Sequence, residues 1–145
     1  MGDINVLSIA LATATPVLIG LIYYHNAVFG KVWQNTIGIT DSKKNRIVGL
    51  AVSLIISFLM AMFLLSFNND GIHQEAEFDT FAHGAWHGTF IAIAVVTPVV
   101  VINGFFARWS WKGIVINIVY WIITLALMGG IVDAMNHWEN IPKPG

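Results

Sequence analysis

Four long apolar runs constrain this chain more than any other feature. They cover residues 6–29, 47–67, 81–106 and 114–134. Each holds the roughly 20 apolar residues that a helix needs to cross the hydrocarbon core of a bilayer. A soluble domain of 145 residues has too little interior to bury four helices that are apolar on every side. The sequence therefore predicts an all-α, polytopic membrane protein, with four transmembrane helices in one domain, residues 1–145.

Composition agrees with this fold class. Hydrophobic residues make up 57% of the chain and charged residues 10%, whereas soluble proteins average roughly 25% charged residues. The chain has no Cys, which excludes disulfides, thiolate nucleophiles, iron-sulfur ligands and c-type haem. It also has no nucleotide-binding loop, Ser-His-Asp order or HExxH pair. The sequence assigns no catalytic residue and no organic cofactor, and an enzyme is the less favoured interpretation.

The basic residues predict how the chain is oriented. Short loops rich in Lys and Arg stay in the cytoplasm, so the connections after the first and third runs are expected to face the cytoplasm. The N-terminus, the central acidic loop and the C-terminus would then lie outside. We expect a multi-pass protein of a bacterial inner membrane, surrounded by lipid, and the net charge of -1 gives no sign of a nucleic-acid partner. Six of the seven basic residues define this bias: Lys31, Lys43, Lys44, Arg46, Arg108 and Lys112.

Carboxylates and imidazoles recur every four residues from the acidic loop into the third run, and again at the end of the fourth. This spacing places them on one helix face if the third helix begins early. Such groups suit Zn²⁺ or another divalent metal, or a proton relay. They are equally well explained as an interfacial polar cluster, because residues 89–106 alone are nearly long enough to span the membrane. The candidate set is Asp79, His83, His87, Asp133 and His137, with Glu75 one turn before the first.

The third and fourth helices are expected to meet at the outer side of the membrane. Asp133 lies one turn inside His137, and His83 lies one turn inside Asp79. Both pairs would enter the membrane from the same face and to similar depths. Since a carboxylate and an imidazole at the edge of a low-dielectric layer gain most by pairing, we expect His83 or His87 close to Asp133.

Small residues and prolines predict how the helices pack. Stripes of small residues let helix backbones approach closely in lipid. Packing within the bundle is favoured for two of the three stripes, and the alternative is that at least one stripe forms a subunit contact. Pro16 and Pro98 each remove a helical hydrogen bond and should bend the first and third helices. The stripes are Gly49, Ser53, Ser57 and Ala61; Gly84, Gly88 and Ala92; and Ala126, Gly130 and Ala134.

Several motifs resemble those of one family. They are the stretch Gly-Leu-Ile-Tyr-Tyr-His-Asn-Ala-Val-Phe-Gly-Lys-Val-Trp at 20–33, Thr-Pro at 97–98, Asn-Gly-Phe-Phe at 103–106 and the Trp-rich turn before Lys112. With them the chain resembles, over nearly its whole length, a family of small bacterial membrane proteins catalogued as domain of unknown function 1761. The resemblance implies four transmembrane helices and no established activity. His25 stands where a small residue or proline is expected from the family pattern, and the ladder of Asp79, His83 and His87 is not part of that pattern.

Three functions are compatible with these features. A small oligomeric channel or transporter-like protein would use the bent helices and the outward His/Asp cluster as a mouth. An accessory or assembly subunit of a larger membrane complex would dock through the small-residue stripes and the basic loop. A metal-binding membrane protein would close the cluster around an ion such as zinc. The first two are favoured over the third, and a homo-oligomer or larger membrane complex is expected.

Overall fold

The structure is a computed structural model that describes residues 4–37, 43–68 and 79–136, and all secondary structure in these parts is helical. Four of its helical segments are long and apolar enough to cross a membrane: Val6–Tyr23, Ile47–Asn68, Phe81–Phe106 and Trp111–Met135. The predicted fold class is confirmed, and the chain is a multi-pass integral membrane protein. The elements are α1 (Val6–Tyr23), α2 (Gly30–Ile37), α3 (Lys43–Asn68), α4 (Phe81–Ile91), the π-helical turn η1 (Ala92–Val96), α5 (Thr97–Phe106) and α6 (Trp111–Met135).

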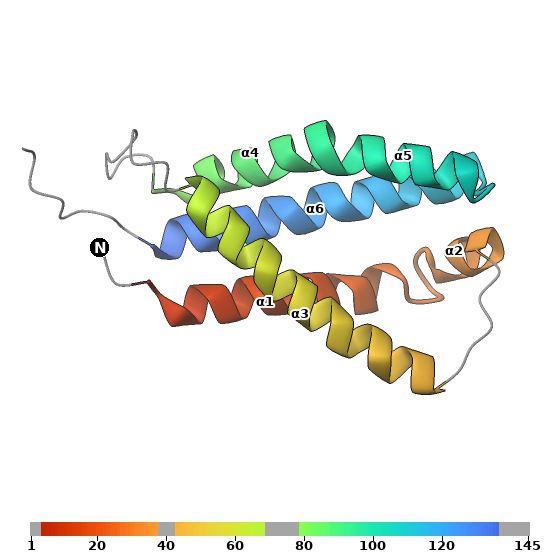
Figure 1. The fold of residues 1–145 in the computed structure, drawn as a ribbon, viewed down its shortest axis with the longest axis horizontal. Coiled ribbons are helices and arrows are strands. Elements are labelled where there is room, and N and C mark those ends of the chain that lie inside the picture. The colour runs from red at the N-terminus through yellow and green to blue at the C-terminus, as the bar shows by residue number, and fades with distance from the viewer. Residues whose placement is uncertain (1–3, 38–42, 69–78, 137–145) are drawn as a thin grey trace, which may run out of the picture.

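The spans form a bundle with one tight and one open end. α4, η1 and α5 form one continuous span that lies along α6, and α1 packs on α6 from the other side (Figure 1). α3 crosses this arrangement diagonally: its end reaches α4, whereas its start diverges from the other helices. The end of the bundle with the exposed residues Lys31, Arg108 and Lys112 is called the basic end. The opposite end, where α1 and α4 begin, is called the outer end, after the predicted orientation.

The first predicted helix, 6–29, is too long. α1 ends at Tyr23, the chain turns through residues 24–29, and α2 occupies part of the expected loop. The turn folds back so tightly that a Cβ on Gly30 would collide with the backbone of Tyr24 and His25. α2 then packs on the start of α6, and its Trp33 ring lies 5.1 Å from that of Tyr24. Hydropathy missed this break because the turn residues are themselves mostly apolar or aromatic.

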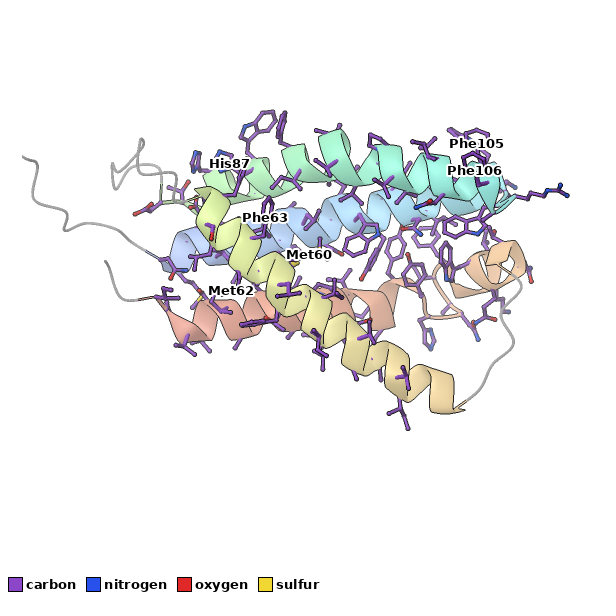
Figure 2. The ribbon with its side chains drawn as sticks, viewed as in Figure 1. Met60, Met62, Phe63, His87, Phe105 and Phe106 are labelled. Carbon is purple, nitrogen blue, oxygen red and sulfur yellow. The ribbon has the colours of Figure 1, made fainter. Side chains whose placement is uncertain are left out.

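Two other helices extend beyond their apolar runs. α3 is Lys43–Asn68 where 47–67 was expected, and α6 is Trp111–Met135 where 114–134 was expected. Hydropathy marks the apolar part of a helix, whereas its ends are set by hydrogen bonds. At the start of α6, for example, the Ser110 hydroxyl accepts a bond from the Gly113 amide and caps the helix. At the end of α5, Phe105 and Phe106 point away from the bundle (Figure 2).

A π-helical turn lies directly before Pro98. Proline cannot donate the backbone hydrogen bond of a regular helix, and local π geometry and Thr hydroxyls commonly compensate in membrane helices. Here η1 ends at Val96, and the Thr97 hydroxyl donates to the Ala92 carbonyl over 2.9 Å. In α1 the Thr15 hydroxyl, next to Pro16, likewise donates to the Leu11 carbonyl over 2.9 Å.

Glycines bring α4 and α6 into backbone contact. A Cβ on Gly84 would collide with the Gly129 carbonyl, and a Cβ on Gly88 would collide with the Leu125 carbonyl. The third-run stripe therefore packs within the chain, against the backbone of Leu125 and Gly129 of α6. The second-run stripe divides into two parts. Its outer part is buried (Ser57 and Ala61), whereas its inner part is exposed (Gly49 and Ser53).

We expect Gly88→Ala to lower the unfolding free energy by about 1–3 kcal/mol, because the added methyl must push α4 and α6 apart. Gly49→Ala is the matched control, since a Cβ there meets nothing within 4 Å. That control should be neutral or, through helix propensity, stabilising by up to about 1 kcal/mol. The measurement is unfolding of the purified protein in mixed micelles, and equal stability of the two variants would contradict the close packing.

Candidate functional site

His83 of α4 and Asp133 of α6 form a pair at the outer end. A hydrogen bond of 3.0 Å joins His83 Nδ1 and Asp133 Oδ2. The Asp133 side chain is only 6% exposed and that of His83 26%, so the pair lies at the rim of the packed interior. The expectation that the third and fourth helices meet here, with His83 close to Asp133, is confirmed.

His87 connects the same site to α3. Its Nδ1 lies 2.9 Å from Oδ1 of Asn68, the last residue of α3. The His83 and His87 rings are in contact, with their centroids 4.2 Å apart and their planes tilted by 57°, and Phe67 packs edge-on against His87. Figure 2 shows His87 at the end of the bundle where α3 reaches α4. Asn68 was not among the candidate residues, because an uncharged amide at the end of an apolar run gives little chemical signal.

A second group of hydrogen bonds ties α1 to α6 at this end. Asn136 Nδ2 donates to the Ser8 hydroxyl over 2.7 Å, and its Oδ1 accepts from the Asn5 amide over 2.8 Å. Asn5 also caps α1 by accepting from the amides of Leu7 and Ser8. Sequence reasoning missed these residues, although an Asn directly before an apolar run is typical of a helix N-cap. We call the whole set the outer polar cluster: Asn5, Ser8, Asn68, His83, His87, Asp133 and Asn136.

The metal-site hypothesis stays a prediction. Zn²⁺ usually takes three or four protein ligands in a tetrahedral arrangement. Among the residues that the structure describes, no group of three or more His, Asp or Glu side chains is placed to hold an ion. Asp79 is half-buried just before the Thr80 cap of α4, and His137 and Glu75 lie outside the described residues.

An apolar layer lies inward of the outer polar cluster. It contains side chains from α1, α3, α4, η1 and α6 that are at most 8% exposed. Measured from the outer end of the bundle, these residues lie beyond the outer polar cluster and before the middle of each span. The layer consists of Ile9, Ala12, Ala61, Leu64, Leu65, Ile91, Ala92, Leu125, Met128 and Val132.

A cavity of about 840 Å³ lies on the other side of this layer. It is bounded by the second half of α1, the diverging part of α3 and the middle of α6. Tyr24, His25, Asn26 and Gln34 line it at the basic end, and mostly apolar residues line it further in. The wall between α1 and α6 is fixed by two hydrogen bonds. The Tyr120 hydroxyl donates to the Pro16 carbonyl over 2.8 Å, and the Tyr23 hydroxyl to the Ile116 carbonyl over 2.9 Å.

Sequence reasoning did not find this cavity. In the sequence, His25 stood out as a departure from the family pattern and not as part of a site. The cavity exists because α3 diverges from α1, and a crossing angle leaves little trace in hydropathy. The clearest available signal was the group of polar and aromatic residues at 23–26, immediately after a long apolar run.

Comparison with known proteins agrees with the expected family. Residues 7–132 match the family described as "Protein of unknown function (DUF1761)". The chain belongs to this family. No curated protein and no solved structure was found to match it. DUF1761 membership thus agrees with the four-span fold and assigns no activity to the outer polar cluster or to the cavity.

A double-mutant cycle tests the pair between α4 and α6. His83→Ala and Asp133→Ala should be coupled by about 1 kcal/mol, because each leaves the other partner without its interhelical hydrogen bond. Trp86→Ala combined with Asp133→Ala is the control, since Trp86 is exposed on the same helix. The control pair should be additive within about 0.5 kcal/mol. Additivity of the His83 and Asp133 variants would contradict the contact.

Proposed function

We propose that this protein is a small transporter-like membrane protein, with its basic end toward the cytoplasm of a bacterial inner membrane. In this proposal the cavity is the substrate site and opens inward. The outer polar cluster acts as the outer gate. Transport by alternating access requires a site that opens to one side at a time, near the middle of the bilayer.

The observation that carries the proposal is the order of three layers along the bundle. The outer polar cluster comes first, the apolar layer next, and the cavity last. A channel would need a continuous polar path, whereas here side chains such as Met128 and Ala12, with no exposed surface, separate the two polar regions. This arrangement supports a carrier over a channel.

The outer gate combines the glycine contact of α4 with α6 and hydrogen bonds between side chains, and the hydrogen bonds are the part suited to opening. The bonds of His83 to Asp133 and of His87 to Asn68 connect three helices at their ends. Interhelical hydrogen bonds in membrane proteins contribute only about 0.6 kcal/mol on average. A few such bonds can therefore be exchanged for contacts with water when the helix ends separate.

Cysteine accessibility tests this proposal, since the chain has no Cys. Ser53→Cys lies in the cavity lining, and a charged, impermeant thiol reagent should reach it only from the basic end. Ala51→Cys is the control, because Ala51 is exposed on α3 but outside the lining and should be labelled from neither side. Asn35→Cys and Ile4→Cys, both exposed, report which side of the membrane each end of the bundle faces.

Weakening the gate should change the side of access. Adding His83→Ala to Ser53→Cys should raise labelling from the outer side about threefold, because the lost hydrogen bond favours opening by roughly 0.6 kcal/mol. Trp86→Ala should leave labelling unchanged. Labelling of Ser53→Cys from both sides without any gate variant would indicate a channel. No response to His83→Ala would overturn the gate, and labelling of Asn35→Cys from outside would overturn the orientation.

An accessory or assembly role is the second candidate, and the exposed part of α3 favours it. A Cβ added to Gly49 would meet no neighbouring atom within 4 Å, and Ser53 one turn later is exposed. Small residues without an intramolecular partner are what a helix from a second subunit would pack against. The same surface would serve a homo-oligomer.

Native mass spectrometry of the detergent-purified protein tests this second candidate. If the exposed stripe is a subunit contact, Gly49→Leu should dissociate the assembly while leaving the monomer folded, because a Cβ at this position meets no atom of the described residues within 4 Å. Ala51→Leu, two residues away on α3, should leave the assembly intact. A monomeric wild-type protein with no co-purifying partner would rule out the subunit contact, and metal analysis of the same sample would test for a bound ion.

A further inference from the structure

The polar groups at the inner end of the cavity offer hydrogen-bond donors. Burial raises the pKa of Tyr24, and the neighbouring phenols of Tyr120 and Tyr23 raise it further, so the Tyr24 hydroxyl keeps its proton. The Nδ1 atom of His25 accepts a hydrogen bond of 3.2 Å from the Ala27 amide. In the neutral ring this leaves Nε2 to carry the proton and to donate.

Two amides complete this polar end. Gln34 Nε2 donates to Asn26 Oδ1 over 3.2 Å, so the Asn26 oxygen is engaged while the NH₂ group of Asn26 is a donor. Among the described residues, the cavity lining contains no Asp or Glu. Lys31 is exposed on α2, the helix that also carries Gln34. The positive charge of Lys31 and the hydrogen-bond donors at this end are therefore complementary to an anion.

The deeper part of the cavity is suited to a hydrocarbon chain. On α3 the lining runs from Leu50 to Met60, ten residues or about 15 Å of helix. That is about half of the 30 Å hydrocarbon core, the depth of one lipid leaflet. Val17 and Leu21 of α1 line the opposite wall, and Figure 2 shows Met60 near the middle of the bundle.

We propose that this cavity binds a single-chain anionic amphiphile, a long-chain carboxylate. Its head would lie among Tyr24, His25 and Gln34, and its tail would run between α1 and α3 toward Met60. The cavity has one polar end, one apolar end and a volume of about 840 Å³, within the range of small-molecule sites. These features favour one chain over a two-chain phospholipid. Transport of this ligand rests on the proposed function, whereas its binding to the cavity does not.

Photo-crosslinking tests the site directly on the unmodified protein. The probe is palmitate with a diazirine near the end of its tail, added to protein in phosphatidylcholine nanodiscs. Saturable adducts are expected at the deep end of the lining, on Val17, Ile56 and Met60, and should be displaced by unlabelled palmitate. Adducts that instead cover lipid-exposed positions such as Val99 and Ile102, without saturation, would overturn the proposal.

Competitors and variants test the two ends of the ligand. Hexadecanol, with the same tail and no charge, should compete at least about tenfold more weakly than palmitate, because hydrogen bonds to charged groups are the stronger ones. His25→Ala with Gln34→Ala should weaken palmitate binding about tenfold for the same reason. Equal competition by hexadecanol would overturn the anionic head. Displacement by phosphatidylglycerol but not by palmitate would assign the cavity to a phospholipid and overturn the single-chain ligand.

A cavity-filling variant completes the test. Gly20→Phe places a ring in the lining and should abolish the adducts, whereas Ala51→Phe, exposed on α3 outside the lining, should preserve them. Full labelling of a folded Gly20→Phe protein would place the probe elsewhere. The crosslinking and accessibility results together separate the binding site from the carrier. If saturable adducts form but His83→Ala does not change the labelling of Ser53→Cys, the binding site stands and the carrier is rejected. If His83→Ala changes that labelling but palmitate forms no saturable adducts, the carrier stands and this substrate class is rejected.

Discussion

The backbone contact between α4 and α6 is the interaction on which the rest of the structure depends. Lipid gives helices no hydrophobic reason to associate, so they adhere through close packing and a few hydrogen bonds. Gly84, Gly88 and Gly129 remove the side chains that would hold the two backbones apart. The resulting approach brings His83 within hydrogen-bonding distance of Asp133. It also fixes α6 as the helix that all the other spans contact.

The other helices are arranged around this pair. α1 is joined to α6 along its length, by Asn5 and Ser8 at the outer end and by Tyr23 and Tyr120 toward the basic end. The buried residues of α3, which are Ser57, Ala61, Leu64 and Leu65, all lie in its outer half, whereas residues 47–56 are exposed. The cavity follows from this unequal attachment, since a helix held at one end and free at the other leaves space beside its neighbours. The proposed carrier uses the same asymmetry, with hydrogen bonds at the closed end and a site at the open one.

Much of the outer site could be predicted from residue spacing. His83 and Asp133 have similar depths from the same membrane face, and two polar groups at the edge of a low-dielectric layer tend to pair. The residues that complete the site are Asn5, Ser8, Asn68 and Asn136, and they were missed because uncharged side chains at helix ends are common and carry little specific signal. Hydropathy likewise could not reveal that the chain leaves the helix after Tyr23, because a turn built from aromatic and apolar residues looks like a continuation of the span.

The sequence by itself determined the number of spans, their all-helical nature and membership of a family with this pattern. It also determined that the two basic connections lie at the same end of the bundle. These properties depend on local composition, because each span must satisfy its own backbone hydrogen bonds in lipid. Only the tertiary structure decided which small-residue stripe is buried, which face of α3 is left open, and that an apolar layer separates the outer polar cluster from the cavity. Those properties depend on helix crossing angles and on contacts such as that between Gly88 and Leu125, which arise from the shapes of two helices together and are absent from either one alone.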